Sequence, residues 1–213
     1  MSKVSIPKYS LAEELINSIS HGIGAALSIV ALVFVILRAH SAVGVTTGVI
    51  YCVIMFLLYT ISCIYHALSP KLLGKKVLRV IDHCNVMLMV AGTYTPLCLS
   101  MIGGLKGLIM FLIVWLVTII AVVFNSIDVD KYQVISVVCN LVLGWAALFL
   151  IKDIIAVSSL KAVYLLIGGG VVYSVGAILY GLGSKKKYMH SIFHFFVLAA
   201  SFLHFCLIYF YAI

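Results

Sequence analysis

The stretch MHSIFHFFVLAASFLHF, residues 189–205, is the core of an apolar run, Tyr188–Tyr211, that is long enough to cross a bilayer and yet carries three histidines. An ionisable side chain in a membrane helix costs a few kcal/mol or more, so it usually has a partner or a function. His190 and His194 are spaced i, i+4, which puts both imidazoles on one helix face about 6 Å apart along the axis. That spacing suits two ligands of one metal ion. The stretch therefore predicts a membrane helix that supplies part of a metal site.

The composition excludes an ordinary soluble domain. Of the 213 residues, 65% are hydrophobic and 9% are charged, whereas about a quarter of the residues of a soluble domain are charged. Apolar runs long enough to cross a ~30 Å hydrocarbon core occur at about 17–37, 43–67, 80–101, 107–124, 133–151, 162–182 and 189–212. These runs lack the alternating segments of a membrane barrel. We expect an all-α membrane protein in which residues 1–213 form one bundle of seven transmembrane helices.

The net charge of +8 is distributed by loop. Ten basic residues share one side of the expected bundle: Lys3, Lys8, Lys71, Lys75, Lys76, Arg79, Lys131, Lys185, Lys186 and Lys187. Four lie on the other side: Arg38, Lys106, Lys152 and Lys161. The positive-inside rule then predicts a cytosolic N-terminus and an outside C-terminus. We interpret these charges as orientation signals, aided by anionic lipid, and expect no nucleic-acid partner.

This topology brings further candidate ligands to the two histidines of the last run. The end of the second run, with His66, and the start of the third run, with Asp82, both lie at the cytosolic face, as does the start of the seventh. The orientation came from lysine and arginine counts alone, so the agreement in depth is independent support. We predict that His66, His190 and His194 bind one metal ion, with Asp82 beside it.

Three neutral imidazoles and a water molecule make a tetrahedral zinc site with one open position. Zinc would lower the pKa of that water to about 7. Asp82 could orient a ligand imidazole or accept a proton from the water. Ser62 lies one turn before His66 and could donate a hydrogen bond near the metal or to a substrate oxyanion. A closed structural zinc site remains an alternative, although such sites usually use four protein ligands, often cysteines.

Three further histidines have weaker claims on this site. For His21, one turn after Asn17, we expect a hydrogen-bonded structural role, because a polar group in hydrocarbon needs a partner. His83 points about 100° away from Asp82 on a helix, so we expect it to be a capping or interfacial residue. His204 lies ~21 Å beyond His190 along the last helix, too far to share the ion, and is expected to be structural or cavity-lining.

Two local features carry predictions of their own. Leu11–Ile16 is expected to form a short interfacial helix that leads into the first span. Pro96 lies inside the third run and predicts a kink, where Thr93 or Thr95 could satisfy the freed carbonyl.

Four motifs resemble those of the hemolysin III family, the bacterial branch of the progestin and adipoQ receptor (PAQR) superfamily of seven-helix membrane proteins. They are EELINSISHGIG (13–24), SCIYH (62–66), IDHCNVMLMVAGTYTP (81–96) and HSIFHFFVLAASFLHF (190–205). In the first, Ser20 stands where many members have threonine. The resemblance covers essentially the whole chain and implies a cytosolic N-terminus and a bacterial plasma (inner) membrane location.

The resemblance also implies roles for single residues. His66, His190 and His194 match the family's zinc ligands, Asp82 matches the acid near the zinc-bound water, and Ser62 matches the serine of the S-x-x-x-H motif. Family relatives include receptors with lipid-amide hydrolase activity and related zinc ceramidases.

The sequence leaves several functions open. The first is a zinc-dependent intramembrane hydrolase that acts on a lipid amide or ester in membrane-lipid or energy homeostasis, with membrane lipid as its partner. The second is a receptor-like lipid sensor in which zinc is structural. The third is a pore-forming cytolysin, although a secreted pore former is soluble before insertion and seven apolar runs leave no polar face.

Overall fold

The computed structural model describes residues 4–183 and 185–213. Lys3, counted above among the cytosolic charges, lies outside these residues. The described residues form helices and no strands: α1 (Leu11–Arg38), α2 (Ala42–Ala67), α3 (Leu73–Pro96), the π-helical η1 (Leu97–Ile102), α4 (Gly104–Ile127), α5 (Val129–Ala146), the short 3₁₀ turn η2 (Ala147–Leu150), α6 (Ile151–Val157), α7 (Leu160–Gly183), α8 (Met189–Leu207) and the π-helical η3 (Ile208–Ala212).

Within the described residues, seven helical segments are long and apolar enough to cross a membrane. The segment Val129–Val157 combines α5, η2 and α6, and Leu73–Ile102 combines α3 and η1. Large apolar side chains such as Leu116 (60% exposed) and Phe149 (76% exposed) cover the outside of the bundle, as expected of a surface that faces lipid. The prediction of an all-α, multi-pass membrane protein is confirmed.

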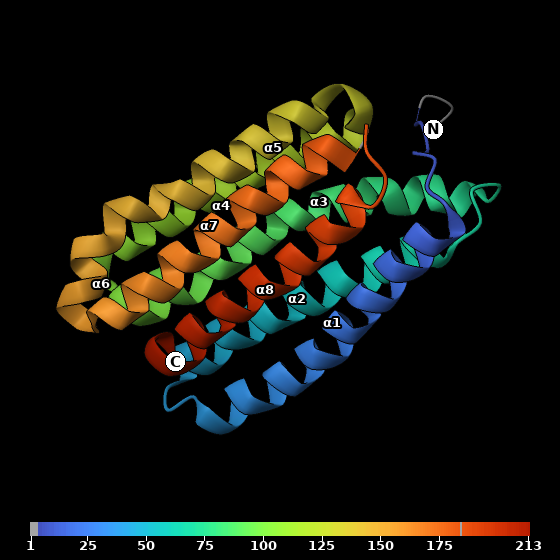
Figure 1. Ribbon diagram of the computed structural model, residues 1–213. Helices are drawn as coiled ribbons and strands as arrows, with labels where there is room; N and C mark the ends of the chain where they lie inside the picture. The colour runs from blue at the N-terminus through green and yellow to red at the C-terminus, as the bar shows by residue number, and fades with distance from the viewer. Residues whose placement is uncertain (1–3, 184) are drawn as a thin grey trace.

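Helices that follow one another in the chain pack side by side in the bundle (Figure 1). α3 packs between α2 and α4, and α8 packs between α7 and α1. In the most apolar stretch of α3, 61% of the residues are buried, against 22% in the corresponding stretch of α4. The polar side chains of α3 must avoid lipid, and a central position allows them to do so. The candidate site residues lie on α2, α3 and α8 and therefore face the interior.

The start of α1 differs from the prediction. Leu11–Ile16 is not a separate interfacial helix but the first turns of a continuous α1. Ser10 and Glu13 form a capping box: the Ser10 hydroxyl accepts from the Glu13 N–H, and the Ser10 N–H donates to Glu13 Oε2 at 2.9 Å. This cap satisfies two otherwise unpaired N–H groups and sets the helix start at residue 11, and the residues that follow include no helix breaker.

At Pro96, where the sequence predicts a kink, α3 ends and the chain continues as the π-helical η1. The expected role of the two threonines is wrong. The hydroxyls of Thr93 and Thr95 donate to the carbonyls of Met89 and Ala91, at 2.9 and 2.8 Å. A hydroxyl has a single proton to donate, so neither threonine donates to the carbonyl that the proline leaves without its helical partner.

Candidate metal centre

Three histidines predicted as ligands come together at one end of the bundle. His66 lies in the last turn of α2, and His190 and His194 lie in the first two turns of α8. All three are buried, and one nitrogen of each lies within 4.8 Å of the others. Ligand nitrogens of a tetrahedral zinc lie about 3.4 Å apart, given Zn–N bonds of about 2.05 Å. The His190 and His194 Nε2 atoms are 3.2 Å apart, so this histidine cluster could hold a metal ion.

The hydrogen bonding of the cluster fits the same interpretation. Within the described residues, His66 Nε2 is buried and has no partner. A buried polar atom without a partner typically costs about 1–3 kcal/mol. The other nitrogen of His66, Nδ1, is already bonded to Glu14, which leaves Nε2 free for the cluster. A bound cation would supply the missing interaction.

A buried ion-pair chain supports His66 from behind. Its Nδ1 lies 2.6 Å from Glu14 Oε2, and the other carboxylate oxygen of Glu14 lies 2.5 Å from Lys75 Nζ. Lys75 also donates to the Leu68 carbonyl at 2.9 Å. A carboxylate on the outer nitrogen of a ligand imidazole fixes the tautomer and the ring orientation. Glu14 therefore holds His66 with Nε2 as the free ring nitrogen.

Sequence reasoning missed the interactions that link His66, Glu14 and Lys75. Lys75 was counted as an orientation charge, yet its side chain is 1% exposed. Glu14 was placed in an interfacial helix, and no role was given to it. The available signal was Glu14 itself, because an acidic residue close to an apolar run indicates a partner. That partner, Lys75, lies 61 positions away along the chain.

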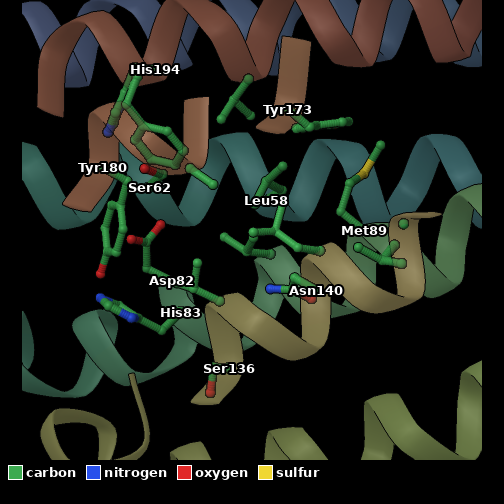
Figure 2. A pocket seen from close by; sticks show the side chains of 18 of the residues that line it. Leu58, Ser62, Asp82, His83, Met89, Ser136, Asn140, Tyr173, Tyr180 and His194 are labelled. Carbon is green, nitrogen blue, oxygen red and sulfur yellow. The ribbon is translucent and has the colours of Figure 1, made fainter. Parts of the chain in front are cut away.

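Asp82 and Ser62, the two further residues predicted for the site, line a cavity together with His190 and His194. Figure 2 shows Ser62, Asp82, Tyr180 and His194 gathered at one end of that cavity, with the Ser62 hydroxyl facing the Asp82 carboxylate. Asp82 is not part of the close group of ligand nitrogens. Its position suits a residue that acts on a molecule bound at the metal, and not a fourth metal ligand.

Two neighbouring histidines have contacts that the sequence did not predict. His83 lines the same cavity and packs edge-on against Tyr180, with ring centroids 6.1 Å apart. It lies within α3, so it is not a capping residue, and its interfacial position stays a prediction. The cavity is bounded by α5 and α7 as well as α8, so two side chains about 100° apart on α3 can both reach it. The His21 ring stacks on the His194 ring, with centroids 3.8 Å apart. Neither nitrogen of His21 has a hydrogen-bond partner within the described residues. The hydrogen-bonded role expected for His21 is therefore wrong.

The N-terminal segment covers the mouth of the cavity. Tyr9 stacks on His190, with centroids 4.9 Å apart, and burial raises the pKa of its hydroxyl. Ser5 donates to Asp130 from its N–H at 2.8 Å and from its hydroxyl at 3.0 Å. Arg79 donates to the Ser5 carbonyl at 2.7 Å and pairs with Asp130 at 2.6 Å. We call residues 5–9 the strap; sequence reasoning gave it no role.

The cavity behind the strap has a volume of about 570 Å³ and continues along α8 to His204. It is within the range of about 300–1,000 Å³ that small-molecule sites occupy. Apolar side chains line most of its length, including Leu58, Val90 and Val197. His204 lines the cavity, as predicted. The cavity therefore has polar groups near the cluster and apolar side chains along its wall.

Comparisons with known proteins agree with the motifs. A family model described as haemolysin-III related matches residues 9–205. The chain is 37% identical over 208 residues to the Hemolysin-3 homolog of Bacillus subtilis (strain 168), which covers 96% of this chain and 97% of that protein. It is 37% identical over 205 residues to Hemolysin-3 of Bacillus cereus, covering 94% and 92%. The human monocyte to macrophage differentiation factor is 25% identical over 167 residues, covering 75% of this chain and 67% of that protein.

Proposed function

The chain belongs to the haemolysin-III-related family, and on that premise we propose that it is a zinc-dependent intramembrane hydrolase that cleaves an amide or ester of an acylated lipid. The observation that carries the proposal is the convergence of three buried imidazoles beside a carboxyl group at the end of a long apolar cavity. We place the cluster at the cytosolic leaflet of the bacterial plasma (inner) membrane, and a role in membrane-lipid or energy homeostasis follows from the substrate class.

Zinc fits the donor set better than other common cations. Three buried imidazoles with no carboxylate among the close ligand atoms suit zinc, whereas calcium and magnesium prefer oxygen ligands. A zinc ion held by His66, His190 and His194 would supply a Lewis acid that makes water reactive at neutral pH and polarises a carbonyl.

The chain's own residues perform the proton transfers in this proposal. The Asp82 carboxylate accepts the proton of the attacking water and then donates it to the leaving amine or alkoxide. The Ser62 hydroxyl donates to the Asp82 carboxylate and holds it toward the reacting atoms. The strap and the apolar cavity wall exclude bulk water and hold the acyl chain in line with the cluster.

The test combines metal analysis with a turnover assay on protein purified in lipid nanodiscs. The parent protein should hold about one zinc per chain and release fatty acid from a long-chain N-acyl amine. Asp82→Asn should keep the metal and lose at least about a hundredfold in rate, because general acid–base catalysis contributes roughly 10²–10⁴. His40→Ala, which changes an exposed histidine, is the matched control and should match the parent.

Two outcomes would overturn the proposal. Full turnover by metal-free protein would remove zinc from the mechanism. A protein that binds zinc and is destabilised by chelation, but cleaves no amide or ester, would favour a receptor-like sensor with structural zinc.

The name of the Bacillus cereus relative, Hemolysin-3, supports a second candidate, a cytolytic function. Purified protein in dye-loaded liposomes tests it directly. Release of dye at low protein-to-lipid ratios would favour this candidate. Intact liposomes would contradict it.

A further inference from the structure

The cavity has a far end, which we define by Trp145, Leu166, Tyr173 and His204, at the opposite end from the histidine cluster. His194 and His204 both line the cavity and are ten residues apart on α8, a separation of about 15 Å along the axis. Figure 2 shows Tyr173 away from His194, with Leu58 on the wall between them and Met89 further along. The cavity therefore runs from a polar end, past apolar side chains, to a second set of polar groups.

Most of the polar groups at the far end have partners in the protein. Trp145 Nε1 donates to the Ser174 hydroxyl at 3.1 Å. The Tyr173 and Ser201 hydroxyls are 2.7 Å apart and bond to each other. Within the described residues, His204 Nδ1 is buried and has no partner. Because buried polar groups are nearly always hydrogen-bonded, an unpaired one beside a cavity needs an explanation.

The bonded nitrogen of His204 fixes what its free nitrogen can accept. His204 Nε2 lies 3.3 Å from the Leu166 carbonyl oxygen. A carbonyl only accepts, so Nε2 carries the proton, and in a neutral imidazole Nδ1 is then an acceptor. The missing partner must donate a hydrogen bond. A hydroxyl group can do so, whereas a ketone or an ester carbonyl cannot.

The space that His204 occupies is built by α7. A Cβ atom at position 169 would lie 2.3 Å from both Nε2 and Cδ2 of the imidazole, so only glycine leaves room for the ring there. One turn later, the ring of Tyr173 packs against His204, with centroids 5.5 Å apart. Gly169 and Tyr173 together hold the imidazole at this position, and the Leu166 carbonyl holds its tautomer.

We propose that the far end is a binding subsite for a hydroxyl group on the hydrocarbon chain of a lipid, which donates its hydrogen bond to His204 Nδ1. An extended alkyl chain advances about 1.25 Å per carbon, from a bond of about 1.52 Å and an angle of about 111°. With the polar end of the lipid at the cluster, the ~15 Å of α8 places this hydroxyl roughly twelve carbons along the chain. The inference rests on the proposed function only in placing that polar end.

The test is binding of free fatty acids to the purified protein in detergent, by isothermal titration calorimetry. The probes contain no amide or ester, so the result does not depend on hydrolysis. The parent protein should bind 12-hydroxydodecanoate about fivefold to tenfold more tightly than dodecanoate, as one net hydrogen bond predicts. It should not show this preference for 2-hydroxydodecanoate, whose hydroxyl would lie at the cluster end.

Two substitutions separate the two nitrogens of His204. His204→Gln keeps an N–H that can donate to the Leu166 carbonyl but has no acceptor at the position of Nδ1, so the preference should vanish. His204→Asn places an amide oxygen near that position and should retain part of the preference. Equal binding of 12-hydroxydodecanoate and dodecanoate by the parent would overturn the proposal and leave water as the partner. An unchanged preference in His204→Gln would overturn the assignment to His204. A protein that hydrolyses nothing but shows the preference would keep this subsite and refute the proposed function.

Discussion

The two ends of the cavity both present buried histidines with unpaired nitrogens, but they differ in number and in support. At the cluster end, nitrogens of three imidazoles lie within 4.8 Å of one another, and a carboxylate, Glu14, bonds the outer nitrogen of His66. At the far end, the lone His204 is bonded on its outer nitrogen by a neutral carbonyl, that of Leu166. Converging nitrogens indicate a shared ligand atom, whereas an isolated one can take a single hydrogen bond.

The group behind each imidazole indicates which ligand lies in front of it. A carboxylate makes an imidazole a stronger donor to a cation and lowers the electrostatic cost of bringing positive charge into a membrane interior. A carbonyl has no net charge and only selects a tautomer. The cluster end therefore suits a cation, and the far end suits a neutral hydrogen-bond donor. This contrast can be tested from both sides.

The largest effect is expected at the cluster end, from His66→Ala. With one of three ligands gone, zinc content should fall below about a tenth of the parent's. At a free zinc concentration a hundredfold above the Kd, zinc binding contributes about 2.7 kcal/mol to stability. Chelation should therefore lower the Tm of the parent and leave that of the variant unchanged. Metal analysis and thermal unfolding measure both quantities. The preference for the 12-hydroxy chain should persist, because it depends on the far end; its loss would show that the two ends are not independent.

Glu14→Gln should have the next largest effect. An outer carboxylate of this kind typically contributes about 10–100-fold to metal affinity, and its loss also leaves buried Lys75 without a counter-ion. Competition with a calibrated zinc chelator measures the affinity. The control is Asp153→Asn, which removes the carboxylate from the ion pair with Lys106, in which both side chains are partly exposed. An affinity equal to the parent's would mean that the contrast between a carboxylate and a carbonyl has no bearing on the metal.

Gly169→Ala should act at the far end alone. The added methyl group overlaps the imidazole of His204, and overpacking of this kind costs about 1–3 kcal/mol. Denaturation and fatty-acid binding should show a less stable protein without the hydroxyl preference but with normal zinc content. Gly168→Ala is the control, because its Cβ would meet Leu203 at an ordinary 3.7 Å and alanine favours the helix. Equal effects of the two substitutions would contradict the close fit around His204.

How far the sequence could predict these two ends depends on the range of the interactions. Helical periodicity and basic-residue counts report on single helices and single loops, and they sufficed for the seven helices and for bringing His66, His190 and His194 together. Partner choice between distant helices has no such local signal. Glu14 could not be assigned to His66, 52 positions away, and His21 gave no sign that it would stack on His194. The tautomer of His204 depends on a backbone carbonyl of α7, which no side-chain pattern reports.

The smallest effect is expected from Ser5→Ala, which loosens the strap over the cluster end. The substitution removes one exposed hydrogen bond to Asp130, worth about 0.5–1 kcal/mol, and leaves the Ser5 N–H and carbonyl contacts in place. A change of that size would raise the open population of the strap about two- to fivefold. Thermal unfolding should be unchanged, while zinc should pass to a chelator about two- to fivefold faster. Ser126→Ala, at an exposed serine of α4 that donates to the Val122 carbonyl of its own helix, controls for the loss of a hydroxyl. If both variants release zinc at the parent's rate, opening of the strap does not limit access, and the ends of the cavity differ in their ligands but not in how they are covered.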